Sequence, residues 1–201
     1  MTCIAVDRLN KNTLIMIGDR CVSDDTGAVM QLPHPKIKKI GNSLIGGCGN
    51  LTPMAYILTL EKDLKKLDRA SDLYAFIWNS LAPKIYAQLD VHGLRTVSEG
   101  STADGLCDIF IVSQNRVFHM ELSQTGFELT ESNTPTAMGS GTPYWMASYT
   151  TLTQLDEANG VRNTKARIQE RMQQAMSVTS NLVTHVDDNV DFITGGGIID
   201  S

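Results

Sequence analysis

The order of the hydrophobic patterns along the chain restricts the folds that it can adopt. Short apolar runs of strand character come first, followed by two helical stretches, further strands, two more helical stretches and one last strand. A doubly wound fold would require strands and helices to alternate one by one. The observed order instead predicts an α+β fold in which helices cover antiparallel sheets, within a single domain over residues 1–201.

Most of the predicted strands form hairpins. The strands are expected at residues 2–7, 14–19, 36–40, 44–48, 107–113, 116–122, 126–130 and 190–194. A polar turn at residues 10–12 joins the first two, and Gly41-Asn42 turns the chain into the strand that begins at residue 44. Gln114-Asn115 suits the turn of a third hairpin, and Gly27 marks a further turn.

Four helices are predicted, because apolar residues recur there at intervals of three and four. The first covers residues 54–67, and the second follows an N-cap at Ser71-Asp72, with a kink expected at Pro83. The third begins near Thr142-Pro143, because proline is favoured at the first helical position. The polar stretch 93–105 is predicted to be a loop. The fourth helix runs from about Thr164 to Asn181, with Ile168, Met172, Ala175, Met176 and Val178 facing inward.

The composition excludes several classes of partner. Hydrophobic residues make up 42% of the chain and charged residues 19%, which is typical of a globular protein. The formal net charge of −5 argues against nucleic acid or an anionic membrane as a partner, since both attract basic surfaces. No run approaches the roughly 20 apolar residues of a membrane span. Asp7 and Arg8 also interrupt the place where the apolar core of a signal peptide would lie, so we expect a cytoplasmic protein.

Neither a metal site nor another cofactor is predicted. The four cysteines and four histidines are scattered, without a C-x-x-C pair or two histidines at helical ligand spacing, so buried thiols are expected. Residues 187–191 imitate the opening of a calcium loop, but Phe192 and Ile198 stand where glycine and glutamate are required. We interpret that segment as a solvated turn, although carbonyl groups there could still bind a cation. The glycines at 195–197 have no helix after them, so they do not form a phosphate loop.

Thr2 is a candidate nucleophile. If Met1 is removed, this residue carries both a hydroxyl and a free α-amine, and an α-amine with a pKa near 8 can act as a base at neutral pH. On the terminus alone, the simpler interpretation is a threonine that opens a strand. Four further groups change this balance. Asp19 ends a strand, Lys36 heads an apolar strand, Gly49 closes a glycine-rich strand end, and Ser140 lies in a Gly-Ser-Gly turn without the G-x-S-x-G elbow of α/β-hydrolases.

Together these motifs resemble the proteasome β-subunit family, above all its bacterial HslV-type peptidases and their phage and bacterial relatives. The resemblance lies in Thr2-x-Ile-Ala, Gly18-Asp19 with Ser23, Lys36-Ile-x-x-Ile, Gly46-x-x-Gly49 and Gly139-Ser140-Gly141. Thr2 to Asp19 and Asp19 to Lys36 are 17 residues each, about one more than is typical of that family. The resemblance covers the whole chain and implies the four-layer αββα sandwich of N-terminal nucleophile (Ntn) hydrolases.

The resemblance also implies a role for each matching residue. Thr2 would be both nucleophile and base, and Asp19 with Lys36 would form the supporting pair. Gly49 would donate to the oxyanion and contact substrate, and Ser140 would assist the α-amine. Ser23 would lie on the strand that pairs with a bound peptide.

The sequence departs from the family at two places. Residues 180–187 replace an Arg-Asp-x-x-Ser-Gly stretch that commonly follows the last long helix, so the third member of that catalytic set cannot be carried over. Asn50 follows Gly49 where a small residue is expected, which could reshape the substrate groove.

Two functions are compatible with these observations. The first is a threonine peptidase that hydrolyses peptide bonds through an acyl-enzyme on Thr2, acting on peptides or unfolded proteins inside a homo-oligomeric ring. A partner ATPase is implied only by analogy. The second is a catalytically silent subunit of the same fold with a structural or assembly role.

Overall fold

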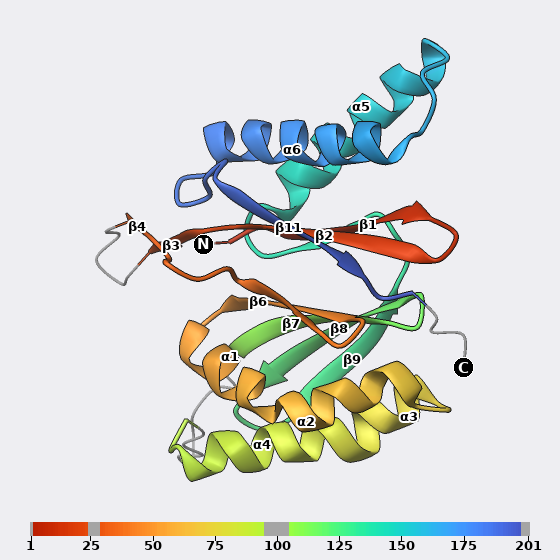
Figure 1. Cartoon of the computed structure of the whole chain (residues 1–201). Coiled ribbons are helices and arrows are strands. Elements are labelled where there is room, and N and C mark those ends of the chain that lie inside the picture. The colour runs from red at the N-terminus through yellow and green to blue at the C-terminus, as the bar shows by residue number, and fades with distance from the viewer. Residues whose placement is uncertain (1, 24–28, 95–104, 198–201) are drawn as a thin grey trace.

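Four layers make up the fold in the computed structural model, which describes residues 2–23, 29–94 and 105–197. Two helices cover one sheet, a second sheet packs against the first, and a group of shorter helices covers the far face of the second sheet (Figure 1). The predicted α+β class and the αββα sandwich are therefore confirmed. Gly27 and residues 95–104 of the predicted loop lie outside the described residues.

The first sheet has the strand order β10-β1-β2-β11, and every pairing in it is antiparallel. Its strands are β1 (Ile4–Asn10), β2 (Thr13–Asp19), β10 (Thr136–Met138) and β11 (Val190–Gly195). β1 and β2 form the predicted hairpin, whereas the three-residue strand β10 was not predicted. β2 therefore lies between β1 and β11, which come from opposite ends of the chain (Figure 1).

The second sheet has the order β5-β6-β7-β8-β9, again antiparallel throughout. Its strands are β5 (Ile37–Ile40), β6 (Ser43–Gly49), β7 (Gly105–Ser113), β8 (Arg116–Ser123) and β9 (Phe127–Ser132). The turn between β7 and β8 has positive φ at both Gln114 and Asn115, which matches the twist of a tight hairpin. A separate two-stranded sheet pairs β3 (Cys21–Ser23) with β4 (Val29–Gln31).

The helices after β6 are more broken than predicted. The helix expected at 54–67 begins earlier, because the Asn50 side chain caps it by accepting from the Thr52 N–H. Asp72 caps the next helical run, in which a π-helical turn ends at Leu81, two residues before Pro83. This turn accommodates the missing N–H of the proline. The elements are α1 (Leu51–Ile57), η1 (Leu58–Leu60), α2 (Glu61–Leu64), η2 (Lys65–Arg69), α3 (Leu73–Phe76), η3 (Ile77–Leu81) and α4 (Ala82–Val91).

The two long helices are α5 (Thr142–Ala158) and α6 (Lys165–Leu182), and both begin close to the predicted positions. The prediction for the inward face of α6 is wrong at one residue, Val178. Val178 is 41% exposed, whereas the polar Thr179 is completely buried and donates its hydroxyl hydrogen to the Ala175 carbonyl. That bond satisfies the hydroxyl within the helix, so Thr179 can occupy the apolar stripe.

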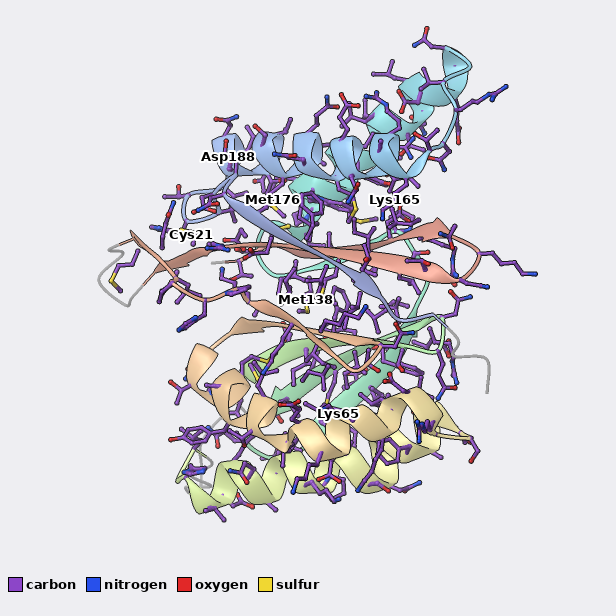
Figure 2. All side chains as sticks on the ribbon, in the orientation of Figure 1. Cys21, Lys65, Met138, Lys165, Met176 and Asp188 are labelled. Carbon is purple, nitrogen blue, oxygen red and sulfur yellow. The ribbon has the colours of Figure 1, made fainter. Side chains whose placement is uncertain are left out.

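Three hydrophobic clusters fill the spaces between the four layers. One lies between the second sheet and α1–α4, another between the first sheet and α5–α6, and the third between the two sheets. Figure 2 shows Met176 between α6 and the first sheet, and Met138 between the two sheets. All four cysteines are buried free thiols, as predicted. Among the described residues, no helix is long and apolar enough to cross a membrane.

Candidate active site

Thr2 lies two residues before the start of β1. The residue is 5% exposed, and its Oγ1 accepts a hydrogen bond of 2.8 Å from Lys36 Nζ. Lys36 precedes β5 in the opposite sheet, so this contact joins the two sheets. Burial raises the pKa of the thiol of the neighbouring Cys3, which disfavours the nucleophilic thiolate form.

The Lys36 side chain is completely buried and fully hydrogen-bonded. An ammonium group has three N–H donors and no acceptor. Here three groups receive them: Thr2 Oγ1, both Asp19 carboxylate oxygens at 3.1 Å, and the main-chain carbonyl of Cys21. Since Asp19 and the Cys21 carbonyl can only accept, the surroundings suit a charged lysine that donates to the threonine hydroxyl.

Asp19 ends β2 and holds that lysine in place. Its Oδ1 accepts from the Cys3 N–H at 2.9 Å, and its Oδ2 accepts from the Cys21 N–H at 3.1 Å. Burial raises the pKa of Asp19, while Lys36 and the two N–H groups act in the opposite direction by stabilising the carboxylate. The bond to Cys3 also connects the aspartate directly to the residue after Thr2.

The turn at residues 139–141 contacts the main chain of Thr2. The Thr2 nitrogen donates to Ser140 Oγ at 3.3 Å, and the Gly141 N–H donates to the Thr2 carbonyl at 3.3 Å. Gly139 has φ of 94°, and a Cβ atom there would lie only 2.2 Å from the Thr2 carbonyl oxygen. Only glycine can therefore occupy this position while Thr2 stays in place.

Gly49 ends β6 with φ of 85° and is exposed to solvent. Two residues earlier on the same strand, the Gly47 N–H donates to the Lys36 carbonyl at 3.2 Å, which fixes this part of β6 beside the lysine. Asn50, which follows Gly49, serves as the N-cap of α1. Capping therefore gives a local reason for an amide side chain at a position where a small residue was expected.

The structure thus joins Thr2, Asp19, Lys36 and Ser140 by hydrogen bonds and places Gly49 at the end of a strand beside Lys36. Ser23 lies on β3 opposite Val29, and its side chain lies outside what the structure describes. The catalytic and substrate-binding roles of these residues remain predictions.

Comparison with solved structures identifies the architecture. The chain superimposes on eukaryotic HslV from Trypanosoma brucei with a TM-score of 0.64 at 16% identity, covering 96% of this chain and 98% of that one. For the proteasome-like BPH of Thiobacillus denitrificans, in complex with epoxomicin, the TM-score is 0.65 at 17% identity, covering 96% of this chain and 97% of that one. For Anbu, an ancestral β-subunit from Yersinia bercovieri, the TM-score is 0.62 at 14% identity, covering 97% of this chain and 81% of that one. The chain has the proteasome-type Ntn hydrolase fold. No protein-family model and no curated protein matches its sequence.

Within the proteasome-type fold, the segment after α6 is where the sequence departs from the expected motif. Here Asp187 accepts from the Arg20 N–H at 3.3 Å, and Arg20 lies between Asp19 and Cys21. Sequence reasoning missed two groups: the Cys21 carbonyl, which carries no side-chain signal, and Asp187, which was interpreted as part of a solvated turn. The only sequence signal was the position of Asp187 within the replaced stretch.

The described residues also show what the site does not contain. Across residues 2–23, 29–94 and 105–197, no group of three or more His, Cys, Asp or Glu side chains could hold a metal ion. The groups that meet around Thr2 are its hydroxyl, the buried Lys36 ammonium group, the Asp19 carboxylate and main-chain N–H donors.

Proposed function

We propose that the chain is an N-terminal threonine peptidase, with Thr2 as nucleophile once Met1 has been removed. The observation that carries this proposal is the 2.8 Å hydrogen bond from Lys36 Nζ to Thr2 Oγ1 within a fully buried Lys36–Asp19 pair. A buried cation beside a hydroxyl lowers the free energy of the alkoxide and therefore favours loss of the hydroxyl proton.

In the proposed reaction, the free α-amine of Thr2 takes the proton from Oγ1, directly or through a water molecule. Oγ1 then attacks the carbonyl carbon of the scissile peptide bond and forms a tetrahedral oxyanion. As the C–N bond breaks, the proton moves from the α-ammonium to the leaving amine and an ester to Thr2 remains. A water molecule, deprotonated by the same amine, hydrolyses the ester and regenerates the hydroxyl.

The remaining site residues support these steps through fixed charges. Lys36 stabilises the negative charge that develops on Thr2 Oγ1, and Asp19 keeps the lysine charged and oriented. The Gly49 N–H is assigned to the oxyanion, because Gly49 is exposed at the end of the strand whose Gly47 N–H donates to the Lys36 carbonyl. Ser140 Oγ, which accepts from the Thr2 nitrogen, would orient the α-amine.

A second candidate function is a catalytically silent subunit of the same fold. In the chain that retains Met1, the Thr2 nitrogen that contacts Ser140 is a peptide nitrogen and cannot act as a base. Such a subunit would keep the buried Lys36–Asp19 pair only to stabilise the fold. The two functions therefore differ in the state of the terminus.

We extend the peptidase proposal to assembly and location. Subunits would form a homo-oligomeric ring in the cytoplasm, with the sites facing a chamber that admits peptides or unfolded proteins. The similarity to HslV supports a ring, and a partner ATPase is proposed by analogy alone. The four reduced thiols are compatible with the reducing cytoplasm.

Intact-mass analysis combined with a peptidase assay tests the proposed function. The peptidase predicts a mature chain that begins at Thr2, cleaves fluorogenic peptides and gains the mass of one covalently bound peptide epoxyketone. A chain that retains Met1 and neither cleaves nor becomes labelled would contradict the peptidase and support the silent subunit.

A further inference from the structure

Arg20 occupies a central position in the site without contacting the predicted nucleophile. It lies between Asp19 and Cys21, which supply two of the three groups that accept hydrogen bonds from Lys36. The direction of the Cys21 carbonyl and the position of the Asp19 carboxylate both depend on the main chain at Arg20. Any group that fixes this main chain also fixes the surroundings of the lysine.

Arg20 lies between β2 and β3, and both its main-chain N–H and its carbonyl are bonded to residues of other segments. Its carbonyl accepts from the Leu32 N–H at 2.9 Å, and its N–H donates to Asp187 Oδ1 at 3.3 Å. The other Asp187 oxygen accepts from Gln31 Nε2 at 3.2 Å, and Gln31 Oε1 accepts from Asn189 Nδ2 at 3.3 Å. Both oxygens of Asp187 are therefore engaged, which orients the carboxylate toward Arg20.

The Arg20 side chain is held as well. Its guanidinium forms a two-pronged ion pair with Asp191 on β11, including a 2.8 Å bond from Nε to Oδ2. The side chains of Arg20 and Asp191 are 31% and 17% exposed, so the pair is partly shielded from water. Figure 2 shows Cys21 and Asp188 at the same end of the molecule, where the segment after α6 meets the end of β2.

We propose that Asp187 and Asp191 are positioning residues of the active site, which act through Arg20 to hold the Asp19–Cys21 segment against Lys36. We term Arg20, Asp187 and Asp191 together the Arg20 clamp. This inference rests on the proposed peptidase function, because positioning of Lys36 matters only if Lys36 assists Thr2. The segment that replaces the expected family motif thus acts on the site through the main chain at Arg20.

Substitutions at Asp187 separate positioning from general folding. Asp187→Ala removes the acceptor of the Arg20 N–H, whereas Asp187→Asn keeps one carbonyl oxygen that can accept it. Asp188→Ala, at an exposed neighbour, is the matched control. Arg20→Ala removes the ion pair with Asp191 but keeps the main-chain bond, and it provides a second test if Asp187→Ala does not fold.

Turnover is measured per active site, with active sites counted by covalent peptide epoxyketone labelling. We expect Asp187→Ala to lower kcat about tenfold or more, since small displacements of a catalytic group cost this much, while KM stays within about twofold. Asp187→Asn should recover most of the loss, Arg20→Ala should lower kcat by a smaller factor, and Asp188→Ala should behave as wild type.

A second readout does not depend on activity. The side-chain ¹⁵N resonance of the Lys36 ammonium should shift or broaden in Asp187→Ala and remain near its wild-type position in Asp187→Asn. If the wild type does not cleave peptides but this pattern is seen, the clamp stands and the proposed peptidase fails. If Asp187→Ala and Arg20→Ala leave both kcat and the Lys36 resonance unchanged, the clamp itself is wrong.

Discussion

At the scale of single residues, removing one partner of the buried Lys36–Asp19 pair should lower the free energy of unfolding. The Lys36 ammonium group is buried with Asp19, and a buried pair that loses one partner leaves the other charge uncompensated. Lys36→Met should therefore lower the free energy of unfolding by about 3–5 kcal/mol and lower kcat by about 10²-fold or more. Chemical denaturation and peptide hydrolysis measure the two effects.

The Asp19→Asn/Lys36→Met double variant is the control for Lys36. It should regain part of the lost stability, because no unpaired charge remains, but none of the lost activity. Recovery of turnover in the double variant would contradict the electrostatic role of the lysine.

Thr2 can be tested with two small substitutions. Thr2→Ala should abolish peptide hydrolysis and epoxyketone labelling, because no nucleophilic oxygen remains. It should also lower the free energy of unfolding by about 1–3 kcal/mol, since one Lys36 N–H loses its buried acceptor. Thr2→Ser, which keeps the hydroxyl, should retain measurable turnover. A fully active Thr2→Ala protein would exclude Thr2 as nucleophile.

At the scale of elements, the turn between β10 and α5 determines where Thr2 lies. Gly139→Ala would place a Cβ atom against the Thr2 carbonyl, so we expect a loss of turnover of about tenfold or more in a fluorogenic assay. Gly160→Ala is the matched control, because Gly160 also has positive φ, at 66°, but no atom within 4 Å of the added Cβ. Both should lose about 1 kcal/mol of stability from backbone strain. Equal effects on turnover would show that strain, and not the contact with Thr2, is responsible.

The junction of α5 and α6 should make stability depend on pH. Asp156 on α5 accepts two hydrogen bonds from Arg167 and one from Arg171, and these bonds, above all those from Arg167, lower its pKa. A carboxyl whose pKa is lowered by folding stabilises the protein above its ordinary pKa of about 4, and this contribution is lost as pH falls through the lowered value. Asp156→Asn should therefore melt below wild type at pH 7.

The comparison must be repeated across pH to isolate the carboxylate. The difference in melting temperature between wild type and Asp156→Asn should shrink as pH falls below about 4. Glu157→Gln, at the exposed neighbouring residue, should show little difference at any pH. A difference for Asp156→Asn that does not change with pH would assign the effect to packing and not to charge.

At the scale of the whole molecule, the outer helices leave apolar surface uncovered. Tyr144, Leu155, Val178 and Leu182 on α5 and α6 are between 41% and 60% exposed. Apolar surface of this kind favours association with further copies, and homo-oligomers usually close symmetrically. Size-exclusion chromatography with light scattering at micromolar concentration should therefore show an oligomer. A stable monomer would contradict the chambered assembly and leave a lone acyl hydrolase.

Sequence patterns predicted those parts of the fold that local chemistry determines. Asp72 and Thr164 cap helices because their side chains accept from the first turns, and Gln114-Asn115 adopts the positive φ of a tight hairpin. Sequence patterns did not predict the features that depend on contacts between residues far apart in the chain. β10 has only three residues and exists because it pairs with β1. The exposure of Val178 could not be read from hydrophobicity alone.

The candidate site shows the same division. The side chains of Thr2, Asp19, Lys36 and Ser140 could be selected from motif order, but their contacts could not be derived from spacing. The carbonyl of Cys21 is invisible in a sequence, because every residue has one. Asp187 was missed because its partner, the Arg20 N–H, is brought near only by the pairing of β2 with β11.

The pairing of β2 with β11 has a consequence for synthesis. Arg20 and Asp191 are 171 residues apart, so a ribosome that adds about 5–20 residues per second needs roughly 10–30 s between them. During that interval the outer edge of β2 has no partner strand, although its apolar residues are already exposed to other nascent chains. This edge is therefore open to incorrect pairing until β11 emerges, and the Arg20 clamp can form only after strands β1 to β10 have been made.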